Sequence, residues 1–114
     1  NKILKYSHFL NKVLNFMNYR VSPIYLAASN NNLEILELLL AERLIEIPSC
    51  CFMKCEKLTE IKLPPTLTEI NERTFLGCSS LKKITIPKTV KTIDSFAFSG
   101  CSSLEEVVFE DDSL

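Results

Sequence analysis

The chain has 114 residues, of which 46% are hydrophobic and 24% are charged, a composition typical of folded proteins and too apolar for a disordered one. Thirteen basic and fourteen acidic side chains leave a net charge of −1, so there is no basic surface for a nucleic-acid backbone. With only two glycines and one histidine, the sequence argues against a glycine-rich phosphate loop, a dinucleotide fingerprint and a multi-histidine metal site. We therefore expect no nucleic-acid partner and no cofactor.

The first predicted element is an amphipathic helix within residues 1–18. Its apolar positions are Ile3, Leu10, Val13, Leu14 and Met17. No segment of the chain approaches the roughly 18 uninterrupted apolar residues of a membrane helix, so we expect no membrane span. Because the chain begins with Asn1 and not with Met, we expect its natural N-terminus to lie upstream.

Two further helices are predicted between residues 22 and 42. Ser22 and Pro23 have the residue types of an N-cap and a first helical position, which predicts a short helix over 24–29. The three asparagines of 30–32 indicate a turn. Residues 33–42 predict a second helix that is apolar on nearly every face, and such a helix is expected to pack on both sides.

These two helices resemble an ankyrin repeat. The sequence Ser22-Pro23-Ile24-Tyr25-Leu26-Ala27-Ala28 is similar to the ankyrin signature T-P-L-H-x-A-A, and residues 33–40 look like the second ankyrin helix. Tyr25 stands where histidine is usual, and Asn31 stands where glycine is usual. The resemblance implies a helical, ankyrin-like N-terminal segment over 1–46. Residues 1–18 can then also be a degenerate preceding ankyrin repeat, an alternative that stays open.

A 23-residue period organises the rest of the chain. Cys55, Cys78 and Cys101 are 23 residues apart, and other residue types recur at the same step. The matching columns include Phe52, Phe75 and Phe98; Leu58, Leu81 and Leu104; Ile61, Ile84 and Val107; Leu63, Ile86 and Phe109; and Ile47, Ile70 and Ile93. The units are 47–69, 70–92 and 93–114.

Each unit combines a strand with a turn. The segment 81–86 ends in an apolar–polar alternation, which predicts a strand with one buried face. Its apolar positions are Leu81, Ile84 and Ile86, and Pro87 ends the strand. Residues 95–100 predict a short helical turn. Gly77 and Gly100 share a column where a left-handed C-cap would lie, and Lys54 fills that column in the first unit under mild strain. One unit is too small to bury its apolar side chains, whereas stacked units bury them against each other. This predicts an α+β repeat solenoid with a parallel sheet.

The repeat resembles the BspA-like leucine-rich repeats, whose units look like I-P-x-x-V-x-x-I-x-x-x-A-F-x-x-C-x-x-L-x-x-I-x. The closest copy is residues 86–104, and the resemblance covers 47–114. Residues 40–47 also fit the leucine-rich columns, so we expect the second ankyrin-like helix to pack on the first repeat as a cap. At the other end the chain is expected to stop within the array. An uncapped last repeat exposes core residues and strand edges, and can associate through them.

The five cysteines have mostly structural interpretations. Cys55, Cys78 and Cys101 are expected to be inward-facing and free, and Cys51 shares a small-residue column with Thr74 and Ala97. Cys50 is the only cysteine that the repeat pattern does not explain, so it is the candidate reactive thiol. A Cys–His pair with His8 has no supporting pattern, and no second cysteine pair provides zinc spacing, so we predict neither a catalytic nor a metal site.

The outward strand positions are the candidate partner-binding residues, because repeat proteins bind partners on their open sheet face. They are Glu60, Lys62, Lys83, Thr85, Glu106 and Val108. Their charges alternate along the column of Glu60, Lys83 and Glu106, so they can equally serve to stabilise the stacking. Phe96 shares a column with Arg73 and is expected to be exposed on the opposite face.

Both resemblances are to interaction scaffolds, which implies a non-catalytic, protein-binding function for a protein partner. The alternative is a cell-surface adhesin for host or matrix proteins, since BspA-like proteins are typically at the cell surface. A remote alternative is a thiol enzyme. The odd cysteine count and the ankyrin-like residues favour the cytoplasm, whereas a signal in an upstream segment would favour the cell surface.

Overall fold

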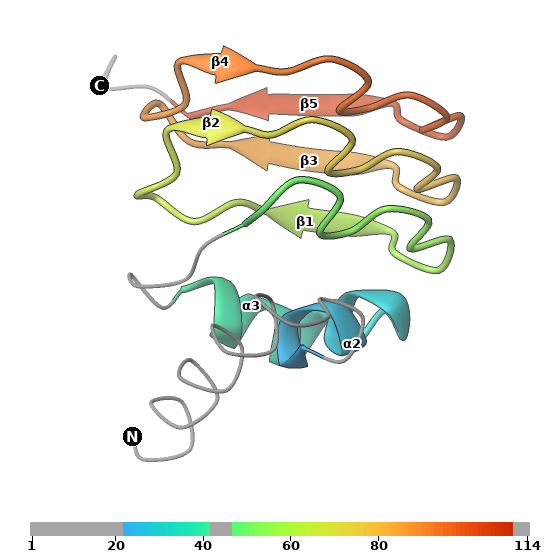
Figure 1. The fold of residues 1–114 in the computed structure, drawn as a ribbon. Helices are drawn as coiled ribbons and strands as arrows, with labels where there is room; N and C mark the ends of the chain where they lie inside the picture. The colour runs from blue at the N-terminus through green and yellow to red at the C-terminus, as the bar shows by residue number, and fades with distance from the viewer. Residues whose placement is uncertain (1–21, 42–46, 111–114) are drawn as a thin grey trace.

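The computed structural model describes residues 22–41 and 47–110, and the helix predicted within 1–18 lies outside them. Two helices lie at one end of a stack of short parallel strands, as Figure 1 shows. The elements are α2 (Pro23–Ser29), α3 (Leu33–Leu40), β1 (Glu60–Lys62), β2 (Glu69–Ile70), β3 (Lys83–Ile86), β4 (Thr92–Ile93) and β5 (Glu106–Phe109). Within the described ranges, neither helix is long and apolar enough to cross a membrane.

The helix starts follow the predicted capping chemistry. The Ser22 hydroxyl accepts a hydrogen bond from the Tyr25 N–H at 3.2 Å, and Pro23 occupies the first helical position. Asn32 caps α3 in the same way, with its Oδ1 accepting from the Ile35 N–H at 3.3 Å. The helix ends at Leu40, earlier than predicted, and the last predicted residue lies outside the described ranges.

The second helix packs on two sides, as expected, but one of its apolar faces stays exposed. Leu36, Leu39 and Leu40 are buried, whereas Ile35 and Leu38 are 44% and 48% exposed. The reason is the position of α3, which packs on α2 along one flank and on β1 along another. The remaining face of α3 has no layer of described residues over it.

The sheet has the predicted period. Its strands are parallel in the order β1-β3-β5, and the register places Glu60 opposite Lys83 and Lys83 opposite Glu106. A second, two-stranded parallel pair joins β2 to β4 with Ile70 opposite Ile93. Every pairing joins residues 23 apart, so each unit forms one turn of the stack.

The core consists of columns of like side chains. The Phe52 and Phe75 rings stack with centroids 5.3 Å apart, and the Phe75 and Phe98 rings repeat the spacing at 5.3 Å. Cys51 lies in the small-residue column with Thr74 and Ala97, and all three are buried, as predicted.

The segment opposite the sheet consists of turns rather than the predicted short helix. Two residues per repeat have left-handed backbone: φ is 57° at Arg73 and 76° at Gly77, and 59° at Phe96 and 79° at Gly100. A right-handed helix cannot continue through such residues. Backbone bonds between repeats hold the turns instead, as from the Gly77 N–H to the Ser99 carbonyl at 2.7 Å.

Candidate binding face and groove

The six candidate partner-binding residues lie on the outer face of the three-stranded sheet. Glu60, Lys62, Lys83 and Glu106 are exposed, and Thr85 and Val108 are partly buried. They alternate with inward residues such as Ile61 and Ile84, which are 4% and 0% exposed. The parallel register sets the two rows of three side by side, so the structure brings all six residues together on one surface.

Two ion pairs cross this face. Lys83 Nζ lies 4.0 Å from Glu106 Oε2, and Lys62 Nζ lies 3.8 Å from Glu110 Oε2. Both pairs are exposed, so each contributes only a few tenths of a kcal/mol, up to about 1 kcal/mol. Within the predicted column of Glu60, Lys83 and Glu106, the ion pair therefore joins Lys83 to Glu106. Glu60 is opposite Lys83 in register, but Lys83 makes its ion pair with Glu106.

A groove of about 220 Å³ separates α3 from the outer face of β1 and β3. Four of the six candidate residues line it, namely Glu60, Lys62, Lys83 and Thr85. The other lining residues are Leu33, Leu36, Glu37, Leu40 and Ile61. The α3 residues were not among the predicted site residues, although the expectation that this helix packs on the first repeat is the signal that could have indicated them.

The cysteine column is a row of hydrogen-bond donors. The Cys78 Sγ donates to the Phe52 carbonyl at 3.1 Å, and the Cys101 Sγ donates to the Phe75 carbonyl at 3.1 Å. Burial raises the pKa of Cys55 and that of Cys78 to about 12, and it raises the pKa of Cys51 as well. These thiols remain protonated near neutral pH, so they lack the thiolate that nucleophiles and metal ligands need.

All five cysteines are free, and the residues described contain no group of side chains arranged to hold a metal ion. Cys50 is half-buried. It has a φ of 64°, close to that of Arg73, and its N–H donates to the Glu72 carbonyl at 3.1 Å. The backbone bond from Arg73 to the Ser95 carbonyl repeats this pattern one unit later. His8, the residue needed for a Cys–His pair, lies outside the described ranges.

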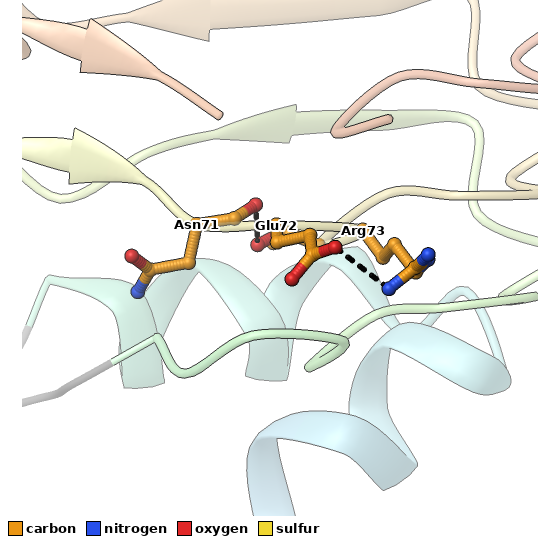
Figure 2. Close-up of polar contacts among 4 residues, drawn as sticks. Asn71, Glu72 and Arg73 are labelled. Atoms are coloured by element: carbon orange, nitrogen blue, oxygen red, sulfur yellow. Dashed lines mark hydrogen bonds and ion pairs between the residues drawn. The ribbon is translucent and has the colours of Figure 1, made fainter. Parts of the chain in front are cut away.

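Phe96 is exposed on the turn side of the stack, as predicted, with 58% of its surface accessible. The Arg73 guanidinium carbon lies 5.4 Å from the Phe96 ring centroid, within the range of a cation–π contact. Arg73 Nη1 also contacts Glu72 Oε1 at 2.7 Å, and Figure 2 shows the two side chains turned toward each other. The Arg73–Phe96 contact therefore joins neighbouring repeats at the surface, whereas the Arg73–Glu72 contact lies within one repeat.

The last repeat exposes positions that are buried in the repeat before it. Ile93 is 47% exposed and Phe109 is 65% exposed, whereas their column partners Ile70 and Ile86 are 1% and 2% exposed. These side chains belong to β4 and β5, each the last strand of its sheet in the described part of the chain.

Comparison with known proteins identifies the repeat. Residues 24–113 match the BspA type leucine-rich repeat region (6 copies). A leucine-rich cell surface protein of Faecalibacterium prausnitzii is similar in structure, with a TM-score of 0.56 and 33% sequence identity over 59% of this chain. The chain spans 18% of the length of that protein.

A search of curated proteins gives no match to the chain. The family match begins at residue 24, so it also covers the segment that resembles an ankyrin repeat, and neither match supports the ankyrin resemblance. Because the match covers most of the sequence, the chain belongs to the family of BspA type leucine-rich repeats.

Proposed function

We propose that this chain is a non-catalytic protein-binding module whose partner contacts the outer face of the sheet. The observation that carries the proposal is the single surface formed by the six outward residues and the adjoining groove. A partner can contact two adjacent rows of side chains at once, which is how repeat proteins present extended binding surfaces. Membership in the leucine-rich repeat family supports a role in protein interaction.

The test compares two charge-reversed variants of the chain as affinity baits. The face variant combines Glu60→Lys with Glu106→Lys, two of the six face residues, and the matched control combines Glu56→Lys with Glu69→Lys, which are exposed and belong neither to the six nor to the groove lining. A partner that the native chain and the control retain and the face variant loses would support the proposal. Equal retention of that partner by the face variant would refute it.

The alternative is an adhesin at the cell surface, and the similar cell surface protein of Faecalibacterium prausnitzii favours it. Cytoplasmic placement is the other proposal, and the five free cysteines are compatible with it. Thiol titration of the protein isolated from its source, unfolded without reductant, separates the two. Five reactive thiols favour the cytoplasm, and fewer thiols favour export.

The remote alternative, a thiol enzyme, requires one cysteine of unusual reactivity. Cys50 is the candidate because the other four thiols are buried or have a pKa raised by burial. If Cys50 is catalytic, iodoacetamide modifies it far faster than a free thiol in a peptide. Modification at the ordinary rate would exclude this alternative.

We also infer that the repeats form a solenoid and that the helical pair serves as its N-terminal, ankyrin-like cap. The packing of α3 on β1 and the constant 23-residue register support this inference. A cap of this kind covers the apolar end of the first repeat, which would otherwise face water.

A further inference from the structure

The groove between α3 and β1 has the size of a side-chain site. Its volume of about 220 Å³ is below the roughly 300–1,000 Å³ typical of pockets for small-molecule ligands. Leucine side chains of α3 form one wall, and the charged outer residues of β1 and β3 form the other. A groove with these walls suits one aliphatic side chain with charged groups beside it.

The charges around the groove are unbalanced. Lys62 and Lys83 line it, but each forms an ion pair, with Glu110 and Glu106 respectively. Glu37 and Glu60 also line it, and within the part of the chain that the structure describes neither has an ion pair within 4 Å. The carboxylates left without a counter-charge therefore favour a cationic occupant.

The edge of β1 adds backbone groups on the same side. The Leu63 N–H donates to the Thr85 carbonyl across the β1–β3 pair. In a parallel ladder, alternate residues turn their N–H and C=O groups to opposite sides, so Glu60 and Lys62 direct theirs away from β3. Figure 1 places α3 on that side of β1. The groove therefore offers backbone donors and acceptors that suit an extended peptide.

We propose that this groove binds an extended peptide segment in which an aliphatic side chain is flanked by lysine or arginine. The aliphatic side chain contacts the leucines of α3, and the basic side chains pair with Glu37 and Glu60. The proposal rests on the protein-binding function proposed above and specifies the chemistry of the partner at one part of the face.

The experiment is a titration of the whole chain with short blocked peptides, followed by amide chemical shifts. The basic probe is Gly-Lys-Leu-Lys-Gly, and the comparison probes are Gly-Glu-Leu-Glu-Gly, Gly-Gln-Leu-Gln-Gly and Gly-Lys-Gly-Lys-Gly. We expect the basic probe to shift the amides of α3 and β1 and to bind about tenfold more tightly than the acidic probe at low salt, since each exposed ion pair contributes about threefold. The probe without leucine should bind more weakly.

Matched variants assign the effect to the two carboxylates. Glu60→Gln and Glu37→Gln should each weaken binding of the basic probe about threefold, because each removes one exposed ion pair. Glu69→Gln, which changes an exposed glutamate on β2 outside the groove, should leave binding unchanged.

Equal binding of the basic and acidic probes would overturn the proposal, and so would shifts confined to residues away from the groove. Either result leaves the protein-binding function standing if the charge-reversed face variant still loses its partner. If the face variant retains that partner while the basic probe occupies the groove, the function proposed for the whole face fails instead.

Discussion

At the residue scale, one backbone position has a positive φ in all three repeats, but only two of the repeats place glycine there. Lys54, Gly77 and Gly100 occupy one left-handed column, with φ of 60°, 76° and 79°. Glycine adopts this conformation at little cost, whereas a residue with a Cβ is strained there. A Cβ added to Gly100 would lie 3.3 Å from the Gly77 backbone, so space limits this position as well as conformation.

We therefore expect Lys54→Gly to raise the free energy of unfolding by about 1 kcal/mol. Gly100→Ala should lower it by more than this, because the added Cβ meets backbone atoms that cannot move aside easily. Urea unfolding of the three proteins measures both changes. Lys57→Gly is the control: Lys57 is exposed and its φ is not positive, so glycine there should not stabilise the protein.

The buried thiols predict a loss of stability at alkaline pH. The pKa of Cys78 rises from 9.0 to about 12 on burial, so between these values the unfolded chain releases a proton that the folded chain keeps. The free energy of unfolding should therefore fall from about pH 9 upward, by as much as about 1.4 kcal/mol per pH unit for each such thiol. Below this range the thiols should have no effect.

Cys78→Ser tests the origin of this pH dependence. The hydroxyl can still donate to the Phe52 carbonyl but does not titrate in this range, so the slope between pH 9 and pH 10.5 should become shallower by roughly one thiol's share. An unchanged slope in urea unfolding at these pH values would show that Cys78 is not responsible.

At the element scale, Asn31 joins the helical pair to the first repeat. Its Oδ1 accepts from the Thr59 N–H at 3.1 Å and from the Thr59 hydroxyl at 3.3 Å. In the later repeats the equivalent N–H groups, of Lys82 and Glu105, donate to carbonyls of the preceding repeat at 2.8 and 2.9 Å. The Asn31 side chain thus takes the place of a backbone carbonyl at the start of the stack.

Asn31→Ala should lower the free energy of unfolding by about 1–3 kcal/mol, since the half-buried Thr59 N–H loses its acceptor and alanine is strained at a φ of 53°. In the same variant, amide hydrogen exchange at Thr59 should become faster. Asn31→Asp keeps an acceptor oxygen at the same position and tolerates left-handed backbone, so exchange there should remain slow. Fast exchange in both variants would contradict this role for the side chain.

Most elements could be predicted from local sequence. The capping residues Ser22 and Pro23 placed the first helix, and the 23-residue period placed the strands in their correct register. The sequence predicts a short helical turn over 95–100, which the structure does not form. The left-handed backbone of Gly100 agrees with the predicted C-cap, but that of Phe96 interrupts the helix, and neither Phe96 nor its column partner Arg73 is a residue type that signals a positive φ.

At the scale of the whole molecule, the stack has two different ends. Helices cover the first repeat, whereas the last repeat leaves β5 as a sheet edge with Phe109 and Val107 65% and 43% exposed beside it. An apolar edge strand of this kind is a template for pairing with another chain.

The 114-residue chain should therefore associate as its concentration rises. Phe109→Glu should reduce association, because it sets a charge on the exposed edge, and it should change the free energy of unfolding little, because the side chain is mostly exposed. Sedimentation velocity over a range of concentrations measures the effect. Phe96→Glu, on the turn side, is the control and should leave association as it was.

The sequence by itself determined the repeat, its register and the outer face of the sheet. A column of like residues every 23 positions is a one-dimensional signal, and each repeat needs only its neighbour to satisfy it. Only the tertiary structure decided where the groove lies, that Glu37 joins Glu60 in it, and which lysines are already paired. These facts depend on how α3 packs against β1 and on which side chains form ion pairs across strands. The 23-residue repeat predicts neither of these.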